Sequence, residues 1–238
     1  MKAKQTVGAA LVLLALVATG LTAQSTSSGE LTVEERFLRN IEFQILREQA
    51  FSDDREMKLL VLDNIGKMVE EGRVSANDTQ YVFMLEYLAM EGISRTVREG
   101  GGGTRILNAF PDVRRQACNL LGKIGGETAA DALLTVLLRD DEYMVKSEAA
   151  YGLGQIGLDK SGAVLETLVY TLDRMDPTRP DNNFAMAVVL AIEKLAAKNN
   201  GLRDPAAYRT LVKIASGNYI RTVKQKALQV LEALKAYN

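Results

Sequence analysis

The stretch Val145–Gly157 reads VKSEAAYGLGQIG, and thirty-two residues earlier Val113–Gly125 reads VRRQACNLLGKIG. The two stretches share the pattern V-[KR]-x-x-A-x-x-x-L-G-x-I-G. Its first, fifth, ninth and twelfth positions are apolar or small and fall on one face of an α-helix. The small fifth residue lets a neighbouring helix approach closely, and the final glycine suits a helix C-terminus. The two stretches therefore predict neighbouring copies of a helical repeat.

Weaker copies of the same register extend the repeat along the chain. They lie at Met57–Met68, Phe184–Leu195 and Val223–Leu234. Each of the five copies follows another amphipathic stretch, at about 33–51, 77–90, 128–138, 163–174 and 205–215. A lone helix pair cannot bury its apolar face, so the pairs must stack on one another. We expect an all-α fold, an α–α superhelix of about five helix pairs over residues 33–238, with an insertion at 92–110.

The repeat resembles the HEAT repeat, in particular the short HEAT-like type of phycobilisome lyase proteins. The resemblance is strong at Val113–Asp140 and Val145–Asp173, weaker at the other three copies, and covers most of the chain after residue 23. It implies a curved right-handed solenoid whose second helices line the concave side. It implies little about function, because one fold serves many partners.

The N-terminal segment is typical of a secretory signal peptide. Lys2 and Lys4 precede the uncharged apolar run Val7–Ala23, and small polar residues follow from Gln24. We predict a signal peptide at 1–23, a flexible linker at 24–32, and a periplasmic or secreted protein exported by a bacterium. The alternative is an uncleaved membrane anchor, for which about 17 apolar residues is at the short limit.

Composition argues against several kinds of chemistry. The chain has no histidine, which removes the commonest general base and metal ligand. Its net charge of −1 lacks the basic excess typical of nucleic-acid binding. Cys118 is the only cysteine and is expected to be a small buried hydrophobe, with an intermolecular disulfide as the alternative. We expect no cofactor, no metal and no catalytic residues.

Two rows of polar residues follow from the repeat register. The residue after the leading apolar position is basic at Lys58, Arg114, Lys146 and Lys224, and we expect it to pair with acids and carbonyls of neighbouring repeats. A second row on the second helices is predicted to face a partner or, alternatively, only solvent. Its members are Lys67, Arg115, Asn119, Lys123, Tyr151 and Lys194.

The insertion at 92–110 carries Arg95, Arg98 and Arg105 around the run Gly100–Gly103. It is predicted to be either a mobile linker or a loop that orders on binding a partner.

The sequence thus favours an exported, non-enzymatic scaffold for protein–protein interaction whose protein partner it does not identify. Two alternatives stay open: a structural subunit of an envelope or appendage assembly, and a lyase-type enzyme suggested by the resemblance.

Overall fold

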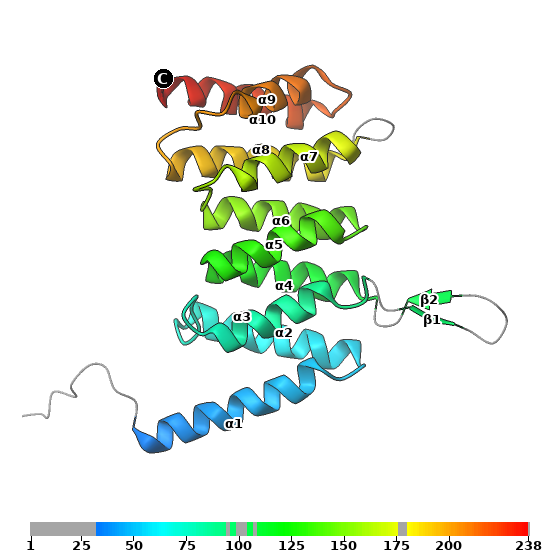
Figure 1. Cartoon of the computed structure of the whole chain (residues 1–238), viewed down its shortest axis with the longest axis vertical. Helices are drawn as coiled ribbons and strands as arrows, with labels where there is room; N and C mark the ends of the chain where they lie inside the picture. Colours follow the sequence, from blue (N-terminus) through cyan, green and yellow to red (C-terminus); the bar gives the residue numbers. More distant parts are fainter. Residues whose placement is uncertain (1–31, 94–95, 99–103, 107–108, 176–179, 238) are drawn as a thin grey trace, which may run out of the picture. The chain divides into compact units, whose positions relative to one another are not determined.

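A computed structural model describes residues 32–93, 96–98, 104–106, 109–175 and 180–237 (Figure 1). The predicted signal peptide at 1–23 and the linker up to residue 31 lie outside these residues. By its internal contacts the chain divides into two units, Met1–Gln44 and Ile45–Asn238.

Ten α-helices account for most of the described residues. They are α1 Val33–Ala50, α2 Arg55–Glu70, α3 Thr79–Met90, α4 Pro111–Ile124, α5 Glu127–Arg139, α6 Tyr143–Ile156, α7 Ala163–Met175, α8 Asn182–Lys198, α9 Pro205–Ser216 and α10 Arg221–Leu234, followed by the 3₁₀ turn Lys235–Tyr237. Taken in chain order, the helices form five successive pairs. The predicted all-α fold of about five helix pairs is confirmed.

In the first unit, the described residues form the start of α1. The Thr32 hydroxyl accepts a hydrogen bond from the backbone N–H of Glu35 (3.1 Å), and the Glu35 carboxylate accepts one from the N–H of Thr32 (2.8 Å). This reciprocal capping box satisfies two backbone donors and fixes where the helix begins.

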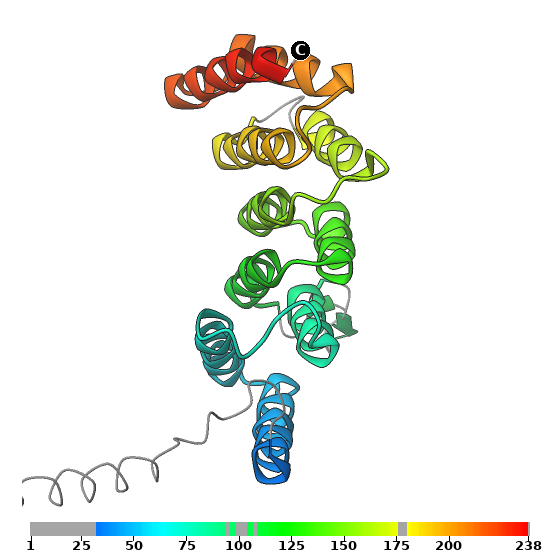
Figure 2. The ribbon, with the colours of Figure 1, turned by 90° about the vertical axis from the view of Figure 1, so that its left-hand side faces the viewer.

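The unit Ile45–Asn238 consists of two layers of helices (Figures 1 and 2). The second helices α2, α4, α6, α8 and α10 pack one on the next in that order, and the first helices α3, α5, α7 and α9 do the same in the other layer. The first, fifth and ninth positions of the repeat are buried, as at Val145, Ala149 and Leu153. Each pair therefore buries its apolar face against the neighbouring pairs.

Glycines set the spacing within the layer of second helices. A Cβ atom at Gly122 would lie 2.7 Å from the Cα of Gly152, and one at Gly154 would lie 2.6 Å from the Cα of Ala191. The helices α4, α6 and α8 can approach this closely only because side chains are missing there. Gly157 ends α6 with a φ of 71°, as the repeat predicted.

The insertion contains a hairpin that sequence patterning did not predict. Strands β1 (Thr96–Arg98) and β2 (Thr104–Ile106) pair antiparallel, with Val97 opposite Arg105. Each strand has three residues, too few to display an alternating apolar pattern. The segment between the strands, 99–103, lies outside the described residues.

Candidate functional site

Most of the predicted row on the second helices is engaged in contacts within its own layer. Lys67 forms an ion pair with Asp63 (2.8 Å), which raises the pKa of Lys67. Lys123 reaches Glu70 on α2 at 3.5 Å. The acids on α2 therefore offset both lysines, and this end of the row is not a basic surface.

Asn119, Tyr151 and Lys194 also form contacts between neighbouring second helices. The amide of Asn119 donates a hydrogen bond to Glu148 on α6 (2.8 Å). The Nζ of Lys194 lies 5.0 Å from the ring centroid of Tyr151, a cation–π contact between α8 and α6. Arg115 is exposed on α4. A role of these residues in binding stays a prediction.

The three arginines of the insertion are placed only in part. Arg98 lies on β1 and Arg105 on β2, while Arg95 is outside the described residues. Arg105 pairs with Val97 across the two strands, and Arg98 is the next residue after Val97.

The other basic row forms a series of buried charge contacts between successive repeats. Lys58, which is fully buried, contacts the carboxylate of Glu91 at 2.5 Å and donates to the carbonyl of Ala50 at 2.8 Å. Arg114 binds the carboxylate of Asp140 through two nitrogens, at 2.6 and 3.3 Å. Glu91 and Asp140 are the C-cap residues of α3 and α5, the first helices of the next pairs. The expected structural role of Lys58 and Arg114 is confirmed.

At the next repeat the series changes. Lys146 donates to the carbonyl of Leu137 (2.9 Å), as Lys58 does to that of Ala50, but in the described chain no carboxylate forms an ion pair with it. Asp173, which the repeat aligned with Asp140, instead binds Lys213 on α9 at 2.9 Å. Asp173 lies within α7, whereas Glu91 and Asp140 directly follow α3 and α5; the residue that directly follows α7 is Asp176, which lies outside the described residues.

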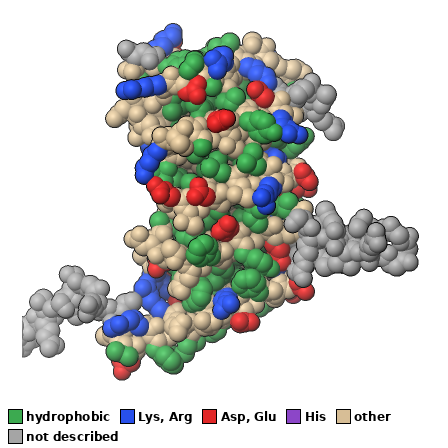
Figure 3. Space-filling model, in the orientation of Figure 1, with side chains coloured by type: hydrophobic (Ala, Val, Ile, Leu, Met, Phe, Trp, Pro, Cys, Tyr) green, Lys and Arg blue, Asp and Glu red, His purple; other side chains and the backbone are tan. Residues whose placement is uncertain are grey.

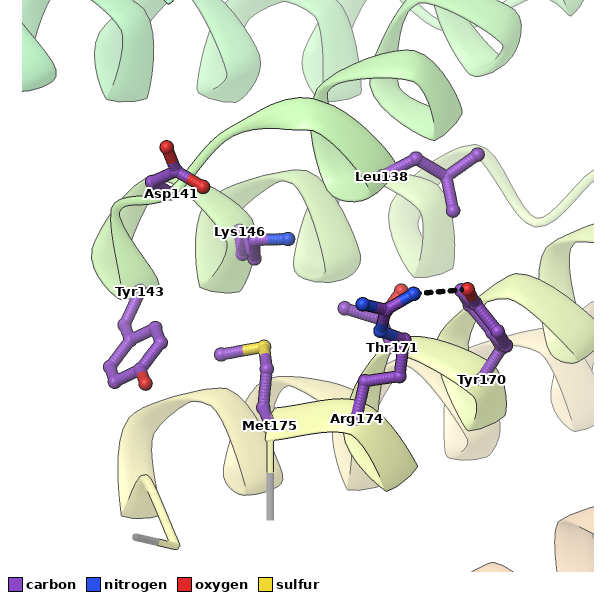
Figure 4. A pocket seen from close by; sticks show the side chains of 8 residues that line it. All are labelled: Leu138, Asp141, Tyr143, Lys146, Tyr170, Thr171, Arg174 and Met175. Carbon is purple, nitrogen blue, oxygen red and sulfur yellow. Dashed lines mark hydrogen bonds between the residues drawn. The ribbon is translucent and has the colours of Figure 1, made fainter. Parts of the chain in front are cut away.

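A pocket of about 440 Å³ lies at this point, between α5, α6 and α7 (Figure 4). It is lined by Leu138, Asp141, Tyr143, Lys146, Tyr170, Thr171, Arg174 and Met175. This volume lies within the range of roughly 300–1,000 Å³ typical of binding pockets. Arg174 donates a hydrogen bond to the hydroxyl of Tyr170 at 2.7 Å, drawn as the dashed line in Figure 4.

The polar groups of the pocket are unevenly satisfied. Burial is the largest effect on the pKa of Lys146 and lowers it; nearby Arg174 lowers it further, while Asp140 and Asp141 act in the opposite direction. The hydroxyl of Thr171 is buried and has no hydrogen-bond partner within the described chain. Both features mark groups that a polar ligand would stabilise, because an unsatisfied buried polar group is costly.

Exposed apolar side chains gather around this pocket. Leu138, Tyr143, Met144 and Tyr170 expose between 39 and 53 % of their surface; three of them line the pocket, and Met144 follows Tyr143. On the face of the molecule shown in Figure 3, hydrophobic side chains form groups among side chains of both charge signs. We name Leu138, Tyr143, Met144 and Tyr170 the apolar rim. Aromatic and methionine side chains of this kind are enriched in protein–protein interfaces.

Sequence reasoning missed most of this site. It singled out Lys146, but assigned it the same structural role as Lys58 and Arg114. Arg174, Tyr170 and Thr171 lie at the end of a first helix, where the repeat pattern fixes no polar residue. The signal that could have located this site lies in the repeat copy Val145–Asp173. There Arg174 and Met175 directly follow Asp173.

The described residues contain no cluster of three or more Asp, Glu, Cys or His side chains that could hold a metal ion. None of their helices is long and apolar enough to cross a membrane. Cys118 is buried, and burial raises the pKa of its thiol far above the ordinary value, so the expectation of a small buried side chain is confirmed.

Comparison with known proteins supports the repeat assignment. Residues 105–175 match the family of HEAT repeats. The chain is similar to deoxyhypusine hydroxylase of Schizosaccharomyces pombe, with 29 % identity over 169 residues, which is 69 % of this chain and 48 % of that protein. The chain thus spans about half the length of this curated relative.

A solved structure shows the same fold. It is the complex of CpcE and CpcF of phycocyanin lyase from Nostoc sp. PCC7120, with a TM-score of 0.55 and 18 % identity, covering 90 % of this chain and 70 % of the matched chain. At this identity the likeness concerns the fold alone. The chain is therefore a HEAT-like α-solenoid whose matched HEAT repeats lie at residues 105–175.

Proposed function

We propose that this protein is an exported, non-enzymatic scaffold that binds another protein through the apolar rim around the pocket between α5, α6 and α7. The observation that carries the proposal is the clustering of Leu138, Tyr143, Met144 and Tyr170, all substantially exposed, around a pocket with two cationic side chains. Aromatic, methionine and arginine side chains dominate the energetics of protein interfaces. The similar solved structure, itself a complex of two proteins, supports the same kind of role.

A comparison of two variants tests this proposal. Full-length wild-type protein and the double variant Y143A/Y170A are used to capture crosslinked partners from the native envelope fraction. The matched control is K123A/K194A, which alters the second-helix layer. We expect the same partner to be captured by wild type and by K123A/K194A, and to be lost with Y143A/Y170A. Loss of partner capture with K123A/K194A alone would indicate that the partner binds the second helices instead.

Export is part of the proposal and rests on the sequence from Lys2 to Gln24. The intact mass of the protein recovered from the native organism tests it. Cleavage before Gln24 and recovery outside the cytoplasm are expected; a cytoplasmic protein that retains Met1–Ala23 would contradict export.

A lyase-type activity is the second candidate, favoured by the fold shared with the phycocyanin lyase complex. A bilin-transfer assay with the purified protein separates the two candidates. Clear turnover would replace the scaffold proposal with this one, whereas we expect none.

A further inference from the structure

We propose that the protein partner docks an amphipathic α-helix along the layer of first helices, across α5, α7 and α9. This inference rests on the proposed function and adds the shape and the charge pattern of the partner's binding segment. It also extends the binding surface beyond the apolar rim, as far as α9. Three observations carry it: a row of apolar side chains, the spacing of the helices that bear them, and the charges beside the row.

Leu134, Tyr170 and Val212 occupy one position on three successive first helices. They are the eighth residues of α5, α7 and α9 respectively. Tyr170 and Val212 expose 49 and 54 % of their surface, and Leu134 is half-buried. In α3 the eighth residue is the polar Glu86, so the row begins at α5. We name Leu134, Tyr170 and Val212 the apolar row.

The spacing of the first helices matches the repeat of an α-helix laid across them. In the stack of first helices, α5 contacts α7 and α7 contacts α9 (Figures 1 and 2). Helices packed in this way have axes about 8–10 Å apart. An α-helix returns to nearly the same face after seven residues, an advance of about 10.5 Å. A partner helix along the stack can therefore present one apolar side chain to each of the three helices.

A β-strand does not fit the same row. It covers about 10 Å in three residues, and side chains three residues apart in a strand point to opposite faces. A polyproline II segment does return to the same face every three residues, after about 9.3 Å. Such segments dock in grooves lined by aromatic side chains, however, and Tyr170 is the single aromatic member of the row. The row therefore favours an α-helix.

The charges beside the row favour one direction of the partner helix. The exposed Asp131 lies about one turn before Leu134 on α5, and the exposed Arg209 lies about one turn before Val212 on α9. Neither takes part in the ion pairs that the described residues form with one another. A helix carries partial positive charge at its N-terminus and partial negative charge at its C-terminus. The partner helix is therefore expected to begin over α5 with basic residues and to end over α9 with acidic residues.

A synthetic helical peptide tests the proposal; we call it the helical probe. It has three leucines spaced seven residues apart, lysines near its N-terminus and glutamates near its C-terminus. Its binding to the full chain is followed by NMR of the methyl groups of Leu134 and Val212. We expect saturable shifts of both. A peptide with the leucines moved to three different faces, and a polyproline peptide with leucine at every third residue, should each bind roughly tenfold more weakly.

One variant and a matched control show whether the row is the docking surface. V212S should weaken binding of the helical probe roughly fivefold, because it removes one apolar contact at a half-exposed position. Leu228 is 55 % exposed and lies on α10, in the other layer, so L228S should bind like wild type. Both variants should melt close to wild type, since both positions are exposed. Equal binding by the two variants would exclude docking along the row.

Charge reversal tests the direction of the helix. A peptide with glutamates near its N-terminus and lysines near its C-terminus should bind wild type about threefold more weakly than the helical probe. The double variant D131K/R209E should reverse this preference. A nitroxide at the N-terminus of the helical probe should broaden the methyl signals of Leu134 and spare those of Val212. An unchanged preference in the double variant, or broadening at Val212 alone, would contradict the assigned direction.

Three further outcomes overturn the inference. Equal binding of the peptide with dispersed leucines would mean that the row accepts any apolar segment. Tighter binding of the polyproline peptide would reassign the row to that class of ligand. A wild-type dimer that V212S dissociates, seen by light scattering, would assign the row to a second copy of this chain.

The failure of this inference is distinguishable from that of the proposed function. If Y143A/Y170A abolishes partner capture but V212S and D131K/R209E leave it unchanged, the partner binds the apolar rim without a helix along the stack. If none of these variants affects capture, the proposed function itself is wrong.

Discussion

At the scale of single residues, the basic row shows how one sequence position serves two purposes. In the first two repeats it is a buried cation matched to a buried carboxylate, and in the third it faces a pocket. Buried ion pairs contribute little net stability, because desolvation of both charges offsets their attraction. The repeat register locates the cation, and Asp140 was among the acids expected to pair with this row; the partner's exact position is not fixed by the register, because it follows a different helix at a variable spacing.

The Arg114–Asp140 pair gives the first stability prediction. Asp140→Ala leaves the buried Arg114 without its carboxylate and should lower the free energy of unfolding by about 3–5 kcal/mol. Asp141→Ala, its exposed neighbour, is the matched control and should change it by less than about 0.5 kcal/mol. The double variant R114M/D140L should recover most of the loss. Urea denaturation measures all three; a double variant as unstable as Asp140→Ala would argue that packing, not an unpaired charge, is responsible.

The ion pair between Arg55 and Asp112 gives a pH-dependent prediction. Burial is the largest single effect and raises the pKa of Asp112, but the hydrogen bond and charge of Arg55, together with backbone N–H groups, outweigh it and lower that pKa below its ordinary value. A carboxyl whose pKa is lower in the folded state stabilises the fold above its ordinary pKa, and this contribution is lost as pH falls through the lowered value. Arg55→Gln should therefore destabilise the protein at pH 7 more than at pH 2. An equal destabilisation at both pH values would contradict the sign.

At the scale of helices, close approach is set by glycine. Gly154→Ala would place a Cβ atom 2.6 Å from the Cα of Ala191 and force α6 and α8 apart, at a cost on the order of 1–3 kcal/mol. Gly66→Ala is the matched control, because its Cβ would meet only Leu120 at an ordinary 3.5 Å and alanine is the better helix former by about 1 kcal/mol. Thermal unfolding should thus show opposite shifts for the two variants. Destabilisation by both would mean that loss of glycine, not helix separation, is responsible.

The helices were also the part of the structure most accessible to sequence reasoning. The four-residue spacing of apolar residues in Val145–Gly157 predicted which helix face is buried. The same register predicted the buried face of the weaker copies. The hairpin of β1 and β2 was not predictable, because strands of three residues show no periodicity. The pocket was missed because it forms where α7 meets the end of α5, a contact between helices distant in sequence.

At the scale of the unit Ile45–Asn238, stability is distributed along a stack in which the main contacts between described helices join each pair to the next. Weakening the interface between two pairs should therefore lower the local stability of the helices on one side of it more than that of the helices on the other side. In Gly154→Ala, amide hydrogen exchange should report a lower opening free energy for α8 and α10 than for α2 and α4. Equal lowering in all four helices would mean that the stack unfolds only as a whole.

The stacked helix pairs can carry a binding site without disturbing the hydrophobic core. The pocket lies at the ends of α5 and α7, outside the buried register of Val145, Ala149 and Leu153. Substitutions in the apolar rim should accordingly alter partner binding while leaving the melting temperature within a few degrees of wild type.

The central claim is that a protein partner docks on the apolar rim. Site-specific photocrosslinking in the native envelope tests it most directly, with benzoylphenylalanine placed at Tyr170 in one protein and at Arg115, exposed on α4, in another. We predict one crosslinked protein adduct from position 170 and none from position 115. An adduct from position 115 alone, or the same adduct from both, would contradict the claim.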